Sequence, residues 1–413
     1  MNNQPNPTGW VGPQQRVAPQ TPPPLPPTIP APRPQQPQQA TGSTQVQSVA
    51  RQPAGSRIAG LVALAVLAGG LGGGAAGFAA AQYLAPASSG IQTQVLQADP
   101  SNPDWAAVAE AASPAVVAIQ VVGQGGQSEG SGVVINAQGH IVTNNHVVSG
   151  SGSQSQLRVT LDNKSYAATV VGTDPTTDLA VIQLVDPPSD LVIMGFADSS
   201  ELVVGEAVMA IGNPLGLEDS VTTGIVSALN RPVTTQAVTD QPAGAASSDE
   251  LVVTAAIQTN AAINPGNSGG ALINSAGDLV GITSSIATVS GGEASGNIGI
   301  GFAIPANQVR YVAEQLIQTG TAQHPQIGVS ARDISALGQR GAEIASVVEG
   351  SPAAEAGLRV GDMITAVNSV PVPGTEALVA QVRSGEVGKQ MSFTVVRDGQ
   401  TQEVTLTPIA ATR

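Results

Sequence analysis

The sequence contains no cysteine and very few aromatic residues. Cys is 0 among 413 residues, and aromatic side chains make up 2% of the total. The absence of Cys excludes a disulfide framework, a thiol nucleophile and a cysteine-ligated zinc or iron–sulfur site. With so few aromatic residues, the hydrophobic cores must be built from Val, Ile, Leu and Ala. A chain of this length favours two or three domains.

Basic charge is also scarce, and the motifs of several cofactor-dependent classes are missing. The formal net charge is −14, which argues against nucleic acid as a partner of the globular part. The sequence has neither a His-Glu-x-x-His zinc motif nor a Gly-x-x-x-x-Gly-Lys-Ser/Thr phosphate-binding loop. We therefore expect no metal site, no cofactor and no ATP-driven step.

Residues 1–57 differ in composition from the rest of the chain. They are rich in Pro and Gln, with a polyproline run at residues 22–27, and they contain four Arg and no acidic residue. Such a segment buries too little apolar surface to offset the entropy of ordering, so we predict a disordered tail. The tail is either a simple tether or a ligand for an aromatic-lined groove on a partner.

Residues 58–84 contain no charged side chain. As a helix they would extend about 40 Å, which exceeds the bilayer core of about 30 Å. Basic residues precede this stretch and acidic residues follow it: Arg51, Arg57, Asp99 and Asp104. The positive-inside rule therefore predicts a single-pass helix in the cell membrane, with a cytoplasmic N-terminus and the rest outside. A cleaved signal peptide is the alternative, although signal peptides normally begin close to the N-terminus.

After a linker at residues 85–104, residues 105–318 consist of short apolar runs separated by Gly, Asn, Asp and Ser. Many short strands divided by turn residues predict an all-β barrel or sandwich, and a segment of about 210 residues suits two small barrels. Helical spacing at residues 309–317 closes this domain. The predicted strands include residues 115–122, 132–135, 167–171, 179–184, 207–211, 221–229 and 279–282.

A further domain is predicted at residues 324–408, where strands and helices alternate. Ser351-Pro352 is a favourable helix start, because Ser caps a helix N-terminus and Pro fits the first helical position. The pair Asp398-Gly399 predicts a hairpin turn. The predicted elements are strands at residues 327–330, 345–348, 363–367, 391–397 and 402–407 and a second helix at residues 375–383.

Ser268 lies in the most informative stretch, Asn264-Pro265-Gly266-Asn267-Ser268-Gly269-Gly270. Glycines on both sides allow a tight turn that presents the Ser hydroxyl and lets backbone N–H groups point at one position. Such an array of donors can stabilise the oxyanion of an acyl-transfer intermediate. A Gly-rich hairpin without chemistry is the alternative.

A general base for this Ser must come from three histidines or from a Lys. His324 lies in the interdomain linker, and His140 starts a strand, which favours a structural role. His146 follows a strand and precedes small apolar residues, so its ring could face a cleft. An acid that opens the next strand, Asp178, could fix the tautomer of His146.

Asp174 is the rival to Asp178, and Asp162 and Asp186 are weaker candidates. With either Asp174 or Asp178, the order along the chain is His, then Asp, then Ser. This is the order of chymotrypsin-type double barrels, and it differs from subtilisin and from the α/β-hydrolases.

Several stretches of this sequence resemble the HtrA (Deg) serine proteases. Residues 351–358 and 360–364 are similar to the PDZ domain that follows the protease in that family. The Pro-rich tail with its anchor resembles actinobacterial members. The chain departs from the family at Asn260, where Asp is usual, and we expect only a local change in packing. The protease-like stretches are residues 143–148, 177–181, 212–214, 223–227, 258–272 and 300–305.

The resemblance spans about residues 104–408 and implies a mainly β fold. A chymotrypsin-like double β-barrel protease domain would be followed by an α+β PDZ domain, after the disordered tail and one transmembrane helix. It implies that Ser268 is the nucleophile, that His146 is the general base and that Asp178 orients His146. Gly266, Asn267 and Ser268 would form the oxyanion hole.

The resemblance also bears on substrate preference. Trypsin-like enzymes that accept a cationic side chain carry an acid six residues before the nucleophile, where this chain has Ala262. Burial of a cation without a partner there would be costly. The family pattern maps the pocket to Ile263, Ile286 and Ile300, which implies cleavage after small aliphatic residues such as Val, Ala or Ile.

In the PDZ-like part, the resemblance implies binding of C-terminal peptides. The peptide would add as a strand along residues 327–330, and backbone N–H groups near Gln326, Ile327 and Gly328 would hold its carboxylate. In the family, peptide binding at this position is linked to activation. The resemblance separately implies a possible homotrimer.

These observations predict a membrane-anchored, ATP-independent serine endopeptidase for protein quality control outside the cytoplasm. Its substrates would be unfolded or flexible proteins. Two polar loops, at residues 232–250 and 283–297, would regulate it by becoming ordered. The alternatives are a PDZ peptide-binding scaffold or chaperone with a mostly latent protease domain, and an envelope receptor whose cytoplasmic tail recruits partners.

Overall fold

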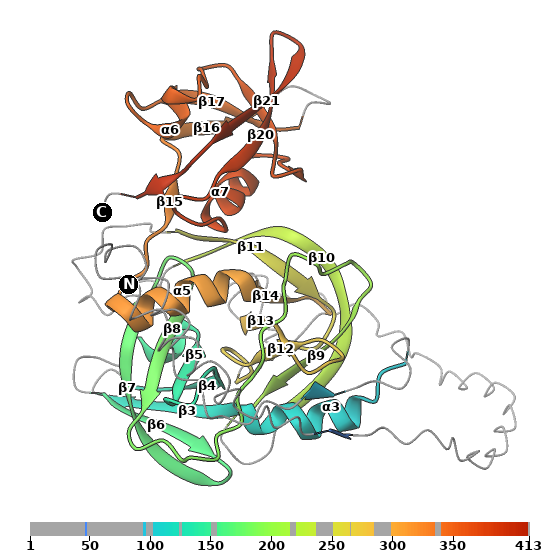
Figure 1. Cartoon of the computed structure of the whole chain (residues 1–413), viewed down its shortest axis with the longest axis vertical. Coiled ribbons are helices and arrows are strands. Elements are labelled where there is room, and N and C mark those ends of the chain that lie inside the picture. The colour runs from blue at the N-terminus through green and yellow to red at the C-terminus, as the bar shows by residue number, and fades with distance from the viewer. Residues whose placement is uncertain are drawn as a thin grey trace, which may run out of the picture. The chain divides into compact units, whose positions relative to one another are not determined.

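The structure is a computed model that describes residues 46–47, 94–95, 102–123, 126–149, 155–214, 220–236, 251–264, 266–284, 299–334 and 340–411 (Figure 1). Most of the predicted tail at residues 1–57 and all of the predicted membrane helix at residues 58–84 lie outside these ranges. Within them, no helix combines the length and the apolar character needed to cross a bilayer. The membrane anchor therefore stays a prediction.

A short strand pair connects two segments that the sequence predicts to be tail and linker. β1 (Val46–Gln47) pairs antiparallel with β2 (Gln94–Val95), and Val46 is opposite Val95. The predicted anchor separates these two strands and would place them on opposite sides of a membrane. The pair can therefore form only in a chain whose residues 58–84 do not span the bilayer.

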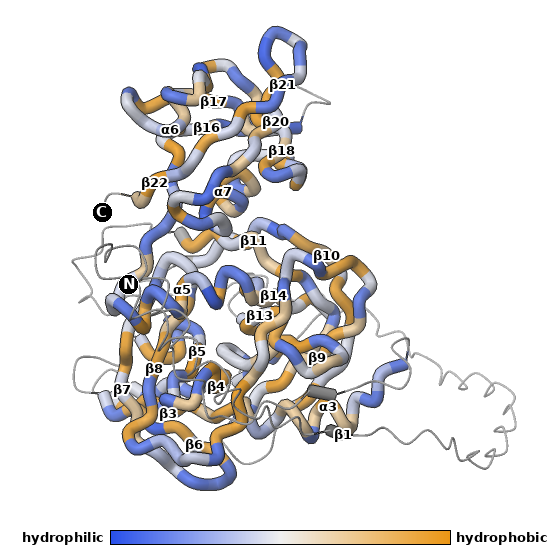
Figure 2. The backbone as a smooth tube through the Cα atoms, in the orientation of Figure 1, coloured by the Kyte–Doolittle hydropathy of each residue, from blue (hydrophilic) through white to orange (hydrophobic). Residues whose placement is uncertain are grey.

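The first barrel closes from antiparallel strands in the order β3-β4-β5-β8-β7-β6. Alternate side chains fill its interior, which is aliphatic, as the composition predicts: Ile119, Ile141 and Ile182 are all fully buried. Hydrophobic colour runs along most of these strands in Figure 2. The strands are β3 (Val116–Gly123), β4 (Gly126–Val134), β5 (His140–Thr143), β6 (Gln156–Leu161), β7 (Lys164–Asp174) and β8 (Leu179–Leu184).

The second barrel closes in the order β10-β11-β14-β13-β12-β9. Its longest ladder joins β10 to β11 and continues to the pair Gln236 and Leu251. Leu272, Ile257 and Val226 contribute to its aliphatic core. The strands are β9 (Ala207–Gly212), β10 (Ser220–Gln236), β11 (Leu251–Thr259), β12 (Ala271–Ile273), β13 (Leu279–Ser284) and β14 (Gly301–Pro305).

Two helices pack against this double barrel. α3 (Trp105–Ala112) begins where the Asp104 carboxylate accepts a hydrogen bond from the Ala107 amide, and η1 (Ser113–Ala115) leads into β3. α5 (Ala306–Thr319) ends at Gly320, whose φ of 76° is the left-handed conformation typical of a helix C-terminus. Residues of α3, α5 and both barrels share one core cluster, so these elements form one domain.

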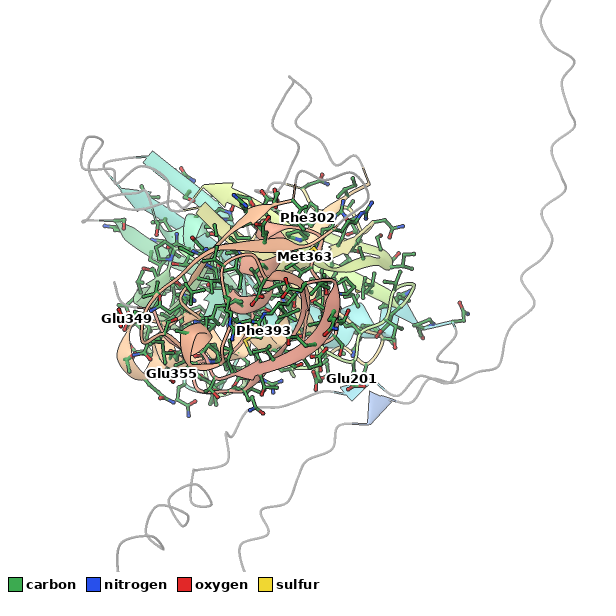
Figure 3. All side chains as sticks on the ribbon, turned by 90° about the horizontal axis from the view of Figure 1, so that it is seen from above. Glu201, Phe302, Glu349, Glu355, Met363 and Phe393 are labelled. Carbon is green, nitrogen blue, oxygen red and sulfur yellow. The ribbon has the colours of Figure 1, made fainter. Side chains whose placement is uncertain are left out.

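The remaining residues form a second domain around a sheet in the order β16-β17-β18-β20-β21, with β19 beside β18. Phe393 is fully buried in its core, and Figure 3 shows it amid the ribbon while Glu349 and Glu355 lie at the periphery. The elements are β15 (Pro325–Gln326), β16 (Val329–Asp333), β17 (Ala342–Val347), α6 (Pro352–Glu355), β18 (Met363–Val367), β19 (Val370–Pro371), α7 (Thr375–Arg383), β20 (Met391–Arg397), β21 (Gln400–Leu406) and β22 (Ile409–Ala410).

The predicted mainly β double barrel followed by an α+β domain is confirmed. Several predicted strands differ in their bounds from the structure: the strand predicted at residues 132–135 overlaps the end of the longer β4, that at residues 221–229 lies within the longer β10, and that at residues 345–348 overlaps β17, which starts at Ala342.

The edge strand differs most for function, because it is Val329–Asp333, where residues 327–330 were expected. Ile327 is instead buried in the core, and Gly328 has a φ of 79° that interrupts the extended chain.

Candidate active site

His146 lies in a one-turn helix, α4 (Asn145–Val148), directly after β5. Val147 and Val148 are buried in the core of the first barrel and fix this turn. The side chain of His146 keeps 17% of its surface exposed. The imidazole is therefore held by its neighbours in the chain while it remains accessible from one side.

Asp178 ends the turn between β7 and β8 and faces His146. Its carboxylate oxygens lie 3.0 and 2.9 Å from Nδ1 of His146, and one oxygen also accepts the His146 backbone N–H at 3.0 Å. The carbonyl of Asp178 accepts hydrogen bonds from Asn144 Nδ2 and Asn145 N, both at 3.0 Å. Because the carboxylate holds the proton on Nδ1, Nε2 is left as the basic nitrogen.

Asp174, the rival acid, lies at the other end of the same turn and has different partners. It accepts a hydrogen bond from Thr177 Oγ1 and one from His324 Nε2 at 2.9 Å. Of the two candidates it is therefore Asp178 that the structure places at His146. His140, which was expected to be structural, contacts Asn136 Oδ1 at 3.1 Å through its Nδ1.

Ser268 lies on the glycine-flanked turn before β12 and is 3% exposed. Ser131 of β4 makes two hydrogen bonds to this turn. Its amide donates to the Ser268 carbonyl at 2.8 Å, and its hydroxyl donates to the Gly266 carbonyl at 2.7 Å. The same hydroxyl accepts the Asn213 amide at 2.9 Å, and Ser131 is fully buried.

Two glycines allow the Ser268 turn to approach the chain that carries His146. A Cβ atom on Gly130 would lie 2.6 Å from Val147 Cγ2 and 3.1 Å from the Ser268 carbonyl oxygen. A Cβ atom on Gly269 would collide with the Ser131 carbonyl oxygen and with Thr143 Oγ1. The Ser268 turn therefore packs directly against the end of β5, beside α4.

Gly266 and Asn267 shape the turn before Ser268. Gly266 has a φ of 98°, a conformation that favours glycine. Asn267 is buried; its amide donates to the Asn264 carbonyl at 3.0 Å, and its carbonyl accepts Thr283 Oγ1 at 2.6 Å. The backbone of the predicted oxyanion hole is thus fixed by hydrogen bonds on both sides.

The residues predicted to form the substrate pocket have different environments. Ile263 is buried in the core of the second barrel, where a Cβ atom on Gly301 would lie 2.5 Å from its Cγ1. Ile300, next to Gly301, is 41% exposed, and Ile286 lies outside the described residues. Gly301 at the start of β14 therefore packs against Ile263 from the chain after β11, and Ile300 immediately precedes Gly301.

A small cavity opens beside the catalytic acid candidate. Ser284 lies at 3.5 Å from Asp178 Oδ2, at the limit of a hydrogen bond. Both side chains line the cavity, with residues from β10, β11 and β14 forming its other walls. The remaining lining residues are Thr177, Val233, Thr235, Val252, Thr254, Ala256, Phe302, Ala303 and Ile304.

In the second domain, the predicted carboxylate-binding residues surround the start of β16. Gln326 ends β15, Ile327 is buried and its carbonyl accepts the Ala353 amide at 3.0 Å, and the Gly328 carbonyl accepts the Val348 amide at 2.8 Å. β16 is an edge strand of its sheet. An extended peptide could therefore add to it without displacing another strand of the sheet.

Asn260, the departure from the family pattern, lies beside β10. Its side-chain oxygen accepts the Ile225 amide at 2.7 Å and touches the position where Gly224 would carry a Cβ atom. A carboxylate oxygen could accept the same hydrogen bond, so the substitution leaves this contact possible.

Several ionisable groups around the barrels have shifted pKa values. Burial lowers the pKa of His140 and raises that of Asp278. The pKa of Asp198 is lowered to about 2, chiefly by hydrogen bonds from the side chains of Ser200 and Asn307. These groups belong to loops and strand ends outside the His146–Asp178 pair, so their shifts concern stability.

A His–Asp pair beside a glycine-flanked serine, carried on two closed antiparallel barrels, defines a trypsin-like serine protease. Residues 130–282 match the trypsin-like peptidase domain, and residues 325–407 match the PDZ domain. The chain belongs to the HtrA family of serine proteases.

Similar proteins support this assignment. Serine protease PepD of Mycobacterium tuberculosis is 42% identical over 362 residues, which cover 83% of this chain and 75% of PepD. Periplasmic serine endoprotease DegP of Escherichia coli is 40% identical over 297 residues, which cover 68% of this chain and 58% of DegP. The chain thus spans less than two thirds of the length of DegP.

Solved structures of one HtrA-type protease, AlgW, share this fold. AlgW with a tripeptide gives a TM-score of 0.54 at 33% identity, covering 75% of this chain and 98% of AlgW. AlgW with a decapeptide gives a TM-score of 0.51 at 30% identity. The likeness extends over nearly all of AlgW.

Sequence reasoning did not find Ser131, Asn144 or the contact between His324 and Asp174. Ser131 stands between two glycines just before the apolar residues 133–135, and these glycines are the local sign of a crowded position. The His324 contact joins residues 150 positions apart, and neither residue lies in a motif that signals it.

Proposed function

We propose that this HtrA-family serine protease is a membrane-anchored endopeptidase that cleaves flexible or misfolded proteins outside the cytoplasm after small aliphatic residues. The observation that carries the catalytic part is the contact of both Asp178 oxygens with His146 Nδ1, beside the Ser268 turn. The chain needs no ATP for this chemistry, so its substrates must already be unfolded or flexible at the cleavage site.

In the proposed reaction, the Ser268 hydroxyl attacks the carbonyl carbon of the scissile peptide bond. Its proton passes to Nε2 of His146, and Asp178 stabilises the resulting imidazolium. His146 then gives the proton to the amine that leaves when the C–N bond breaks. Water releases the acyl group from Ser268 by the same proton transfers in reverse.

The negative charge that develops on the carbonyl oxygen needs hydrogen-bond donors. The amides of Gly266 and Ser268 lie on the two sides of Asn267, in a turn that Ser131 anchors through the carbonyls of the same two residues. We assign the oxyanion hole to these amides, and loss of one such donor typically costs about 3 kcal/mol of barrier.

The preference for small aliphatic side chains rests on the residues around Ile263 and Ile300. Ala262 offers no charge to a basic substrate side chain, and the buried Ile263 packs against Gly301, next to the partly exposed Ile300. With Ile286, these residues would form a shallow apolar pocket. Cleavage of a peptide library predominantly after Lys or Arg would contradict this assignment.

The PDZ domain would regulate the protease by binding C-terminal peptides. Support comes from the edge position of β16, from the glycine turn at Gly328, and from AlgW, whose solved structures contain peptides. Residues 232–236 and 283–284 of the two predicted loops are strand in β10 and β13. We propose that peptide binding orders the rest of these loops, at residues 237–250 and 285–297, and that the active form is a homotrimer.

The exposed sheet edge of the PDZ domain also favours a second candidate function, a peptide-binding scaffold or chaperone whose protease domain is mostly latent. A peptidyl phosphonate that mimics a small aliphatic substrate separates the two functions. Labelling of the full chain, but not of Ser268→Ala, supports the protease. Absence of labelling with every C-terminal peptide added supports the scaffold.

A further inference from the structure

Asp174 is a buried carboxylate that the catalytic mechanism does not use. It is 4% exposed and ends β7, opposite Leu179 at the start of β8. Within the connecting turn, the Thr177 amide donates to the Asp174 carbonyl at 3.3 Å, and the Asp178 amide donates to the Pro175 carbonyl at 3.4 Å. Asp174 and Asp178 therefore begin and end the same five-residue turn.

Two side chains donate to the Asp174 carboxylate, one on each oxygen. Thr177 Oγ1 binds Oδ2 from within the turn, and His324 Nε2 binds Oδ1 at 2.9 Å from outside it. The side chain of His324 is 15% exposed, so little water reaches the contact. A carboxylate this deeply buried needs such partners, because an unpaired charge would be strongly destabilised.

His324 reaches Asp174 from a segment that is itself fixed to the protease domain. After α5, the Gly320 carbonyl lies against β7, where a Cβ atom on Gly172 would approach it to 2.7 Å. Ala322 is buried in the shared core, and the Gln323 amide donates to Gln315 Oε1 at 3.0 Å. The last helix of the protease domain and the chain after it therefore place the His324 imidazole at the turn between β7 and β8.

We propose that His324 is a positioning residue for the catalytic acid, an inference that rests on the proposed function. By holding Asp174, it fixes the turn in which Asp178 adopts the left-handed φ of 56° and presents both oxygens to His146. Without the His324 donor, the buried carboxylate rearranges toward another partner or toward water. The Asp174 carboxylate then keeps only the bond from Thr177 of these two, and Asp178 no longer holds His146 in one orientation.

The test measures how fast the full chain reacts with the peptidyl phosphonate, which reports the reactivity of Ser268 independently of natural substrates. His324→Leu removes the donor, and His324→Gln keeps an N–H donor on a side chain of similar reach. His140→Leu is the matched control. His140 is a half-buried histidine of the first barrel, which also carries Asp174, and its ring contacts Asn136 instead of an acid.

We expect His324→Leu to lower the maximal inactivation rate about tenfold while the apparent affinity for the phosphonate stays within about twofold, as for loss of one hydrogen bond to a charged group. His324→Gln should recover most of the rate, and His140→Leu should match the wild type. A purely structural role for His324 would instead lower the melting temperature and leave the rate per folded molecule unchanged.

An unchanged rate in folded His324→Leu overturns the proposal, and so does an equal loss in His324→Gln. If His324→Leu does not fold, the same rate is measured for Thr177→Val, which removes the other donor to Asp174. A wild-type inactivation rate in Thr177→Val would then overturn the proposal. Failure of the proposed function is distinct, since the wild-type chain would then not be labelled at all.

Discussion

Two glycines with nearly the same backbone conformation differ in what surrounds them. Gly269 and Gly277 have φ values of 82° and 85°, so any other residue would be strained at either position. A Cβ atom on Gly269 would collide with Ser131 and Thr143, whereas at Gly277 nothing described lies within 4 Å. The pair therefore separates the cost of the backbone conformation from the cost of crowding at the active site.

We predict that Gly277→Ala lowers the free energy of unfolding by about 1–2 kcal/mol, the cost of the left-handed conformation alone. Gly269→Ala should add about 1–3 kcal/mol of overpacking and abolish phosphonate labelling, because Ser268 must move. Chemical denaturation and labelling of both variants check this. If the two variants had equal stability and were labelled equally, the Ser268 turn would accommodate a Cβ atom at Gly269, and the account of crowding there would be wrong.

The functional residues differ in how far the sequence could reveal them. His146 could be selected because the chain has only three histidines, and Ser268 because its glycines stand at fixed offsets. Ser131 and His324 could not, because each acts through a contact that only the folded chain creates, 135 and 150 residues away in sequence. Asp178 could be preferred over Asp174 because it opens the next strand and lies in a stretch that resembles the family, and its contact with His146 bears this out.

At the scale of elements, one buried ion pair joins β20 to the chain before β18 in the PDZ domain. Arg397 donates to both Asp362 oxygens at 2.6 Å, and the Arg359 amide donates to the same carboxylate at 2.8 Å. Burial raises the pKa of Asp362, but the bonds from Arg397 and Arg359 outweigh it, so the pKa lies below its ordinary value. Folding therefore favours the ionised form.

We predict that Asp362→Asn lowers the free energy of unfolding of the PDZ domain by about 2 kcal/mol at pH 7. This is less than the 3–5 kcal/mol for a fully buried pair, because Arg397 is 24% exposed. The contribution is fully present above the ordinary carboxyl pKa of about 4 and is lost as the pH falls through the lowered pKa. Thermal unfolding from pH 7 to pH 2 checks this, and a difference between the two proteins that stays constant would contradict it.

Strands and helices with a clear period were predictable, and short or uniform segments were not. β8, β18, β20 and α7 have the bounds that the pattern predicts. α3 was missed because its Ala-rich sequence has no polar stripe to reveal a helical period. β14 was missed because it is short and contains Gly and Pro, which usually mark turns.

For the whole molecule, the N-terminal anchor remains a prediction from charge and hydropathy. We expect the full chain to sediment with membranes and to resist extraction by high salt, because residues 58–84 are long enough to span a bilayer. Deletion of residues 58–84 should release the protein, whereas deletion of residues 1–57 should retain it and leave proteolysis intact. Membrane fractionation of the three proteins checks this.

A soluble full chain would contradict the anchor and would allow the β1–β2 pair, which needs both of its strands on one side of a membrane. The two arrangements therefore predict opposite results in the same fractionation.

The most direct measurement is the rate of phosphonate labelling of Asp178→Asn relative to the wild-type chain, with folding verified by thermal unfolding. If Asp178 holds the Nδ1 proton of His146 so that Nε2 can activate Ser268, the substitution should slow labelling by about 10⁴-fold. Labelling of the folded variant within about tenfold of the wild-type rate would show that Ser268 is activated without Asp178, and the assignment of these three residues as one catalytic unit would be wrong.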